Sequence, residues 1–226
     1  EWQGTGTASD AAAFTWTTWP AALNRYYCSD EELKSRLGIT DTADDFEITL
    51  AVATASRAID QVCGRHFFQA TETRTYIPYS LYQTRIDDIA SVTALAADPG
   101  GTAAQGSTFP VSWPAGSFQL LPVNPNRHGE PWPYTRIKAV GGLTFPWVAP
   151  VVLARLDRVQ VTGPFGWPAI PLNVHMASLI SATDLFRLKD APFGIAGAGE
   201  FAVRIQANPR IMALLAPYAK DPPVAR

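Results

Sequence analysis

Histidines are the first residues to consider for chemistry, and their placement argues against a catalytic site. His66, His128 and His175 are far apart along the chain. His128 lies in the loop 126–131 near Glu130, a pairing that acid–base catalysis could use. A turn rich in Asn, Gly and Pro accounts for the same loop without catalysis. The sequence also contains no G-x-S-x-G, H-E-x-x-H or C-x-x-C motif, so we predict that the protein is not an enzyme.

Three closely spaced glycines, Gly194, Gly197 and Gly199, are the next candidate, as a phosphate-binding loop. No Lys followed by Ser or Thr accompanies them, and their spacing is not that of a dinucleotide loop. The segment before them is predicted to be a helix rather than a strand. We therefore predict no cofactor, and we interpret this stretch as a loop that a partner orders.

The two cysteines, Cys28 and Cys63, both lie in apolar surroundings. Two such residues form neither a disulfide framework nor a metal site. We predict buried free thiols, no bound metal and a reducing compartment.

Tryptophans are numerous and fall into two groups. Those beside prolines in the middle of the chain are Trp113, Trp132, Trp147 and Trp167. Such residues could stack on carbohydrate, but we expect them to fill a hydrophobic core instead. Another group stands in an N-terminal segment with no periodic structure of its own: Trp2, Trp16 and Trp19. Exposed indoles there would be unfavourable, so we predict that these three bind another protein.

Charge is low and uneven along the chain. Charged residues make up 17% and hydrophobic residues 47%, which excludes a disordered, highly charged protein. Residues 1–65 hold ten acidic against five basic residues, 66–170 six against seven, and 171–226 four against six. The net charge of −2 does not suit a nucleic-acid-binding protein. An acidic first third suits self-association or a charged partner, although ordinary solvated surfaces would look the same. The most apolar stretch, 143–156, contains two prolines and an arginine, so we predict no membrane span.

Two helices are predicted early in the chain. Ser29 and Glu32 form a capping box, and Gly38 ends the helix 30–37. A longer helix is predicted from Thr40 or Asp41 to residue 63. Its apolar residues recur at spacings of four, three, four and three: Ile48, Val52, Ala55, Ile59 and Val62. A second apolar strip, Phe46, Leu50 and Ala53, predicts that this helix buries more than one narrow face.

The middle of the chain is predicted to be β-rich. Residues 66–170 contain twelve of the nineteen prolines. Short β-prone runs separated by turn residues predict strands at 71–77, 84–89, 91–97, 109–113, 118–121, 134–140 and 153–162.

Helices return towards the C-terminus. A helix beginning at Pro171 and running to about 188 is expected to present Met176, Leu179, Ile180, Thr183 and Phe186 on one face. We expect it to pack on the second helix through Met176, Ile180 and Phe186. A brief strand is predicted at 201–205. Asn208 and Pro209 then predict a short last helix to residue 215, ended by Pro217.

These elements predict an α+β fold, a small helical bundle with a large proline-rich β insertion and extended terminal arms. Residues 1–24 form an N-terminal assembly arm. Residues 25–65 and 171–189 form the helical bundle, 66–170 form the β insertion, and 190–226 form a loop and a docking helix.

Several phrases occur in the order found in head-to-tail adaptor (connector) proteins of tailed bacteriophages. Residues 26–33 lead into 37–39, and residues 55–67 resemble the family phrase A-S-x-x-I-D-x-x-x-G-R-x-F. Residues 161–168, 186–194, 199–201 and 214–218 resemble the versions in phages of actinobacteria. The resemblance covers roughly residues 25–90 and 155–219.

This resemblance implies a non-enzymatic virion protein. Such adaptors form a ring, commonly of twelve copies, beneath the portal protein, and they are assembled in the host cytoplasm. The ring extends the DNA channel without sequence-specific binding and contacts the next neck or tail protein. Because adaptor C-terminal segments attach to the portal, we predict a partner-binding surface there, formed by Phe193, Phe201, Arg204, Arg210, Ile211 and Leu215. Two alternatives stay open: a stopper-like neck protein, against which the long helices argue, and a carbohydrate-binding β module.

Overall fold

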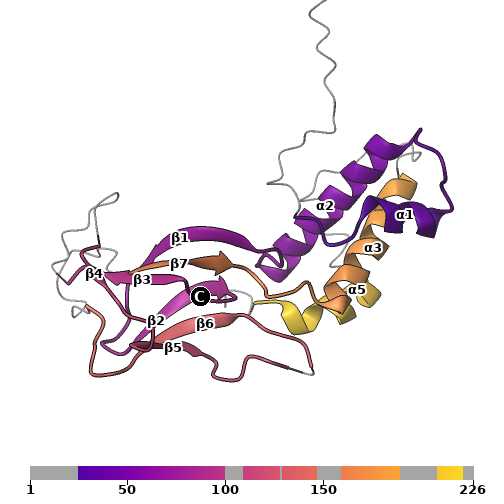
Figure 1. Ribbon diagram of the computed structural model, residues 1–226. Helices are drawn as coiled ribbons and strands as arrows, with labels where there is room; N and C mark the ends of the chain where they lie inside the picture. Colours follow the sequence, from indigo (N-terminus) through magenta and orange to yellow (C-terminus); the bar gives the residue numbers. More distant parts are fainter. Residues whose placement is uncertain (1–24, 100–108, 128, 147–158, 189–207, 221–226) are drawn as a thin grey trace, which may run out of the picture.

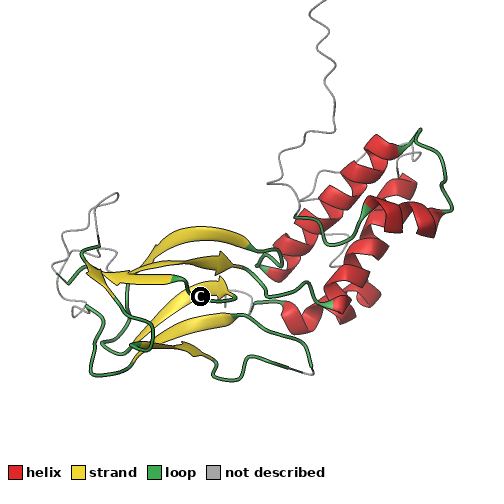
Figure 2. Ribbon diagram, viewed as in Figure 1, coloured by secondary structure: helices red, strands yellow, loops and turns green. Residues whose placement is uncertain are grey.

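The computed structural model describes residues 25–99, 109–127, 129–146, 159–188 and 208–220. The helices gather at one end of the molecule and the strands at the other (Figure 1). All the described strands lie between the second and third helices of the chain (Figure 2). The fold is therefore α+β, as the sequence predicts.

The described residues form four α-helices and one 3₁₀ helix: α1 (Asp30–Leu37), α2 (Asp45–Cys63), α3 (Leu172–Arg187), α5 (Pro209–Leu215) and η4 (Ala216–Tyr218). Both hydrogen bonds of the predicted capping box are present at the start of α1. The Ser29 hydroxyl accepts from the Glu32 amide, and the Glu32 carboxylate accepts from the Ser29 amide. Gly38 and Gly64 adopt left-handed conformations at the ends of α1 and α2. On α5, the Asn208 side chain accepts from the backbone amides of the first turn, as predicted.

The predicted start of α2 at Thr40 or Asp41 is wrong by about one turn. The helix begins at Asp45, and residues 41–44 form turns instead. The Asp41 carboxylate accepts a hydrogen bond from the Ala43 amide at 3.2 Å. This short-range bond satisfies the backbone in a non-helical conformation, which is how Asp delays the start of a helix.

Within the described ranges, seven strands form one antiparallel sheet: β1 (Ala70–Tyr76), β2 (Gln83–Ile89), β3 (Ala94–Ala97), β4 (Val111–Ser112), β5 (Phe118–Leu121), β6 (Tyr134–Ala139) and β7 (Val159–Phe165). Strand β7 pairs with β1 along its whole length and with β3 over its first four residues. It meets β2 only where Phe165 lies opposite Ile89. Strands β2, β6 and β5 continue the sheet from there, so the sheet curls around its own core. The strand predictions are therefore confirmed to within a few residues, apart from 153–158 and the predicted strand 201–205, which lie outside the described residues.

Two hydrophobic clusters make up the core. The larger is formed by the helices and includes Ile48, Val52 and Ile59 of α2 at 0% exposure. The smaller fills the curl of the sheet, where Trp113 stacks on Phe145 with ring centroids 4.8 Å apart. As expected, Cys28 and Cys63 are buried free thiols.

One prediction about buried faces is wrong, and another is confirmed only in part. Phe46 and Leu50 of α2 are 54% and 39% exposed, so the second apolar strip is not buried within this chain. The predicted face of α3 enters the core only in part: Ile180 and Phe186 pack against the helical core but, like Met176, are half-buried. The fully buried residues near the middle of α3 are small: Ala177, Ser178, Ser181 and Ala182. Small side chains let α3 pack closely against both α2 and α5, and a count of large apolar residues does not detect such a face.

Among the described residues, no helix is both long and apolar enough to cross a membrane.

Candidate functional site

Five aromatic side chains from distant parts of the sequence meet where the helices join the sheet: Tyr27, Phe67, Trp132, Trp167 and Tyr218. The ring centroid of Trp167 lies 5.2 Å from that of Phe67, 4.7 Å from that of Trp132 and 5.5 Å from that of Tyr218. Trp132 and Tyr218 stack at 5.6 Å. This junction cluster joins α1, α2, the sheet and the C-terminal helices into one unit.

The tryptophans in the middle of the chain that the structure describes lie in hydrophobic cores. Trp113 and Trp167 are buried and Trp132 is half-buried against the helical core. They fill cores, as expected, and the buried indole faces are not available to stack on a sugar. Trp147 lies outside the described residues.

A buried carboxylate lies next to the cluster. The Tyr27 hydroxyl donates to Asp60 and accepts a hydrogen bond from the Phe67 amide at 2.9 Å. Asp60 also forms an ion pair with Arg57 at 3.2 Å, and the Nδ1 atom of His66 lies 3.1 Å from its carboxylate. Burial raises the pKa of Asp60, while the Tyr27 hydrogen bond, Arg57 and His66 lower it by less. Burial also raises the pKa of Tyr27, as does the neighbouring Asp60.

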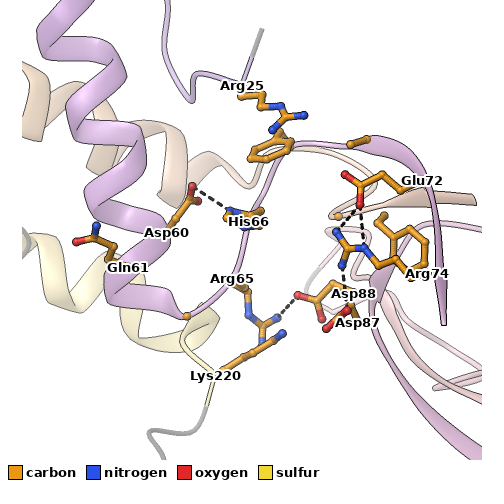
Figure 3. A pocket seen from close by; sticks show the side chains of 15 residues that line it. Arg25, Asp60, Gln61, Arg65, His66, Glu72, Arg74, Asp87, Asp88 and Lys220 are labelled. Carbon is orange, nitrogen blue, oxygen red and sulfur yellow. Dashed lines mark hydrogen bonds and ion pairs between the residues drawn. The ribbon is translucent and has the colours of Figure 1, made fainter. Parts of the chain in front are cut away.

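Beside Asp60 there is a cavity of about 410 Å³ between the end of α2 and the sheet (Figure 3). Arg65, which follows α2, reaches Asp88 of β2 at 3.4 Å. On the sheet side, Arg74 pairs with Glu72 at 2.8 Å and with Asp87 at 2.9 Å. Figure 3 shows these pairs lying along the cavity wall, so most of the charges that face the cavity already face an opposite charge.

This arrangement ties the sheet to the helices. The Arg65–Asp88 pair is reinforced by a backbone hydrogen bond from Gly166 to the Asp88 carbonyl at 2.7 Å. The nearby Cys63 thiol is buried, which raises its pKa to about 12, so it is protonated at neutral pH. Within the described ranges, no three His, Cys, Asp or Glu side chains are grouped as metal ligands.

His175 is a half-buried residue of α3, as predicted, and its Nε2 lies 3.0 Å from the Glu32 carboxylate. Glu32 accepts from the Ser29 amide and from His175, and these bonds lower its pKa. The pair fastens α1 to α3.

Most of the predicted partner-binding residues lie outside the described residues: Trp2, Trp16, Trp19, Phe193, Phe201 and Arg204. Arg210 is exposed on α5. Ile211 and Leu215 are 2% and 0% exposed, because α5 packs against α3 of its own chain. This corrects the expectation that another protein must supply the groove for these two side chains. That the remaining residues bind a partner stays a prediction.

Among the described residues, seven of the eleven exposed large apolar side chains lie in two places. One is the end of the sheet away from the helices, where the turn between β1 and β2 lies beside the segment after β6: Ile77, Tyr79, Leu81, Tyr82 and Leu143. The Phe145 amide donates to the Leu81 carbonyl at 2.7 Å and so holds the two segments together. The other place is α2, at Phe46 and Leu50.

Sequence reasoning did not find the ionic junction. Asp60 and Arg65 stand in the phrase that carries the family resemblance, but their partners Tyr27 and Asp88 are 33 and 23 residues away along the chain. The one available signal was an acidic residue on the otherwise apolar face of a helix, since such a residue requires a partner.

The site and fold together define an α+β protein whose helices and curled sheet are locked at a charged, aromatic junction. No family model and no curated protein matches this sequence. Among solved structures, the fold is similar to that of a chain described as "Neck of empty GTA particle computed with C6 symmetry". The match has a TM-score of 0.50 and 18% sequence identity, and it covers 87% of this chain and 91% of that chain. At this level of identity the similarity establishes a shared fold.

Proposed function

We propose that this chain is a structural protein of the neck of a tailed phage or phage-like particle, and that it is the head-to-tail adaptor. In this role it forms a ring, of twelve copies, beneath the portal protein. The ring extends the DNA channel and binds the next neck or tail protein. It assembles in the host cytoplasm and remains in the virion.

The main support for the proposal is the similarity of the fold to a neck chain of a GTA particle, which covers 87% of this chain. The phrase at residues 55–67, which carries the resemblance to adaptors, supplies Asp60, Arg65, His66 and Phe67 to the junction. Helices and strands are thus fixed relative to one another by the residues of that phrase.

Two further features support a subunit of an assembly. Large apolar side chains are exposed at the end of the sheet and on α2, as in proteins that associate. The net charge of −2 suits a channel through which DNA slides, since rows of unpaired Lys and Arg would retain phosphate.

Electron microscopy of the purified full-length chain tests the proposal. We expect rings with a central opening, and we expect them to bind purified portal protein. Deleting residues 1–24 should leave the circular dichroism spectrum of the remaining fold unchanged while reducing ring formation. Monomers at every concentration, with no binding to the portal, would contradict the proposal.

A further inference from the structure

An exposed face of the sheet carries three neighbouring positive charges. The register of β2 and β6 places Arg85 directly opposite Arg136 and Gln83 opposite Lys138. All three basic side chains are exposed, whereas the residues between them, Ile86 and Ile137, point into the core. We call Arg85, Arg136 and Lys138 the basic face.

Two like charges opposite each other on paired strands repel, so this register is favourable only if a nearby negative charge offsets the repulsion. The carboxylate closest along β2 on the same side is Asp87, but it is already paired with Arg74 at 2.9 Å and bonded to Tyr76 at 3.2 Å. In the parts of the chain that the structure describes, no carboxylate forms an ion pair with the basic face. Anionic groups from another molecule would relieve the repulsion.

Apolar side chains border the basic face. The Arg85 guanidinium lies 5.7 Å from the ring centroid of Tyr79, and Tyr79 bonds to Gln83. Tyr79 and Tyr82 are exposed. A surface with cations beside exposed tyrosine rings resembles a protein-binding surface more than a track for a phosphate backbone.

A surface of matching chemistry exists on the same chain. Residues 30–47 hold seven acidic against two basic residues, which accounts for the acidity of the first third of the sequence. Thr49 of α2 bonds to Asp30 of α1 at 2.6 Å, so the acidic ends of both helices lie together. We call Glu31, Phe46, Glu47 and Leu50 the acidic face; Glu31, Phe46 and Leu50 are exposed, and Glu47 is half-buried.

We propose that the basic face of one copy docks on the acidic face of the next copy. This rests on the proposed function, because it names the contact that would build the ring. The two surfaces are different, so the contact is heterologous, and repeated heterologous contacts close into rings when the rotation allows. Opposite charges orient the two copies, and the apolar side chains on both sides exclude water.

Charge reversal of each face tests the proposal. One variant carries Arg136→Glu and Lys138→Glu, and the other carries Glu31→Lys and Glu47→Lys. Each variant alone would bring like charges together at every contact, and we expect the concentration for half-assembly to rise by about tenfold or more. An equimolar mixture would restore opposite charges at every contact, provided that the variants alternate, and assembly should recover. Arg136→Lys, which keeps the charge, is the matched control and should assemble as the parent protein does.

Sedimentation velocity measures assembly, and circular dichroism verifies that each variant is folded. The proposal is wrong if the reversed variants assemble as the parent does, or if two folded variants fail to recover on mixing. If Arg136→Glu with Lys138→Glu leaves assembly unchanged but weakens retention of double-stranded DNA, the basic face binds DNA instead. If the parent protein never assembles, both the proposed function and the proposed contact are wrong. If the parent assembles but the reversed variants assemble equally well, only the proposed contact is wrong.

Discussion

The Tyr27 hydroxyl donates a hydrogen bond to the Asp60 carboxylate, although 33 residues separate them, and the same oxygen accepts from the Phe67 amide. One side chain thus satisfies a buried carboxylate of α2 and a buried backbone amide on the way into β1. Tyr27→Phe should lower the free energy of unfolding by about 1–3 kcal/mol, because the Phe67 amide loses its partner and Asp60 loses one of its partners. Urea denaturation measures the effect. Tyr26→Phe removes a hydroxyl from a half-buried neighbour and should change stability by less than about 0.5 kcal/mol; equal losses in both variants would contradict the role of Tyr27.

Helix α2 carries a buried face and an exposed apolar face. Ile59 is fully buried, so Ile59→Ala should cost about 2–5 kcal/mol. Leu50→Ala removes a similar side chain that is 39% exposed, and it should change the stability of the dissociated protein by about 0.5 kcal/mol or less. Thermal denaturation of the monomer measures both. An unchanged melting temperature for Ile59→Ala would remove this residue from the core.

The sequence predicted the elements better than their contacts, for a physical reason. The capping box of α1 and the Asn208 cap of α5 involve residues within a few positions of each other, so the local sequence contains the whole signal. The contact between Arg65 and Asp88 depends on how β2 is placed against the end of α2, which no local pattern encodes. The buried face of α3 was missed because Ser178 and Ser181 count as polar.

For the predicted docking helix, the same reasoning indicated that apolar residues are buried but not which surface buries them. Ile211 and Leu215 were expected to need a groove, and they have one, yet α3 of the same chain supplies it. A pattern of apolar residues shows that a helix must be covered; it does not identify the covering surface.

Hydrogen exchange of the dissociated protein should reflect this packing of α5. We expect the amides of 211–215 to be strongly protected before any assembly, since opening this helix would expose Ile211 and Leu215. Ile211→Ala should abolish the protection and cost about 2–5 kcal/mol. Arg210→Ala, at the exposed neighbouring position, should preserve it. Protection that arises only upon ring formation would instead return α5 to the role of a docking helix.

Asp60 and Glu32 should give pH dependences of opposite sign. Burial raises the pKa of Asp60 above its ordinary value of 3.8, so the folded protein binds this proton more tightly than the unfolded chain does. This carboxyl therefore makes the free energy of unfolding fall as the pH rises above about 3.8. For Glu32 the pKa is lowered from 4.5 by the Ser29 amide and His175, so its contribution is present above that pH and is lost as the pH falls.

Denaturation at several pH values between 3 and 7, about the range in which carboxyls titrate, measures both effects. Asp60→Asn should remove the downward slope with rising pH, and Glu32→Gln should reduce stability at pH 7 but have little effect near pH 3. The assignment of Asp60 is wrong if Asp60→Asn and the parent protein have parallel profiles.

Gly166 provides the sharpest test of how the sheet joins the helices. It follows β7 with φ of +113°, and a Cβ built on it would lie 1.9 Å from the Phe68 carbonyl oxygen, which is backbone and cannot move aside freely. Gly142 has φ of +82° but nothing within 4 Å of its Cβ position. Both substitutions by Ala incur the cost of a positive φ, about 1–2 kcal/mol for a left-handed residue, and Gly166→Ala adds the steric contact with Phe68. We expect Gly142→Ala to remain near that cost and Gly166→Ala to lose more than about 3 kcal/mol, in urea denaturation or as loss of folded protein. Equal stability of the two variants would mean that the chain after β7 does not approach Phe68 as described. The arrangement of the sheet and helices at the junction would then be wrong.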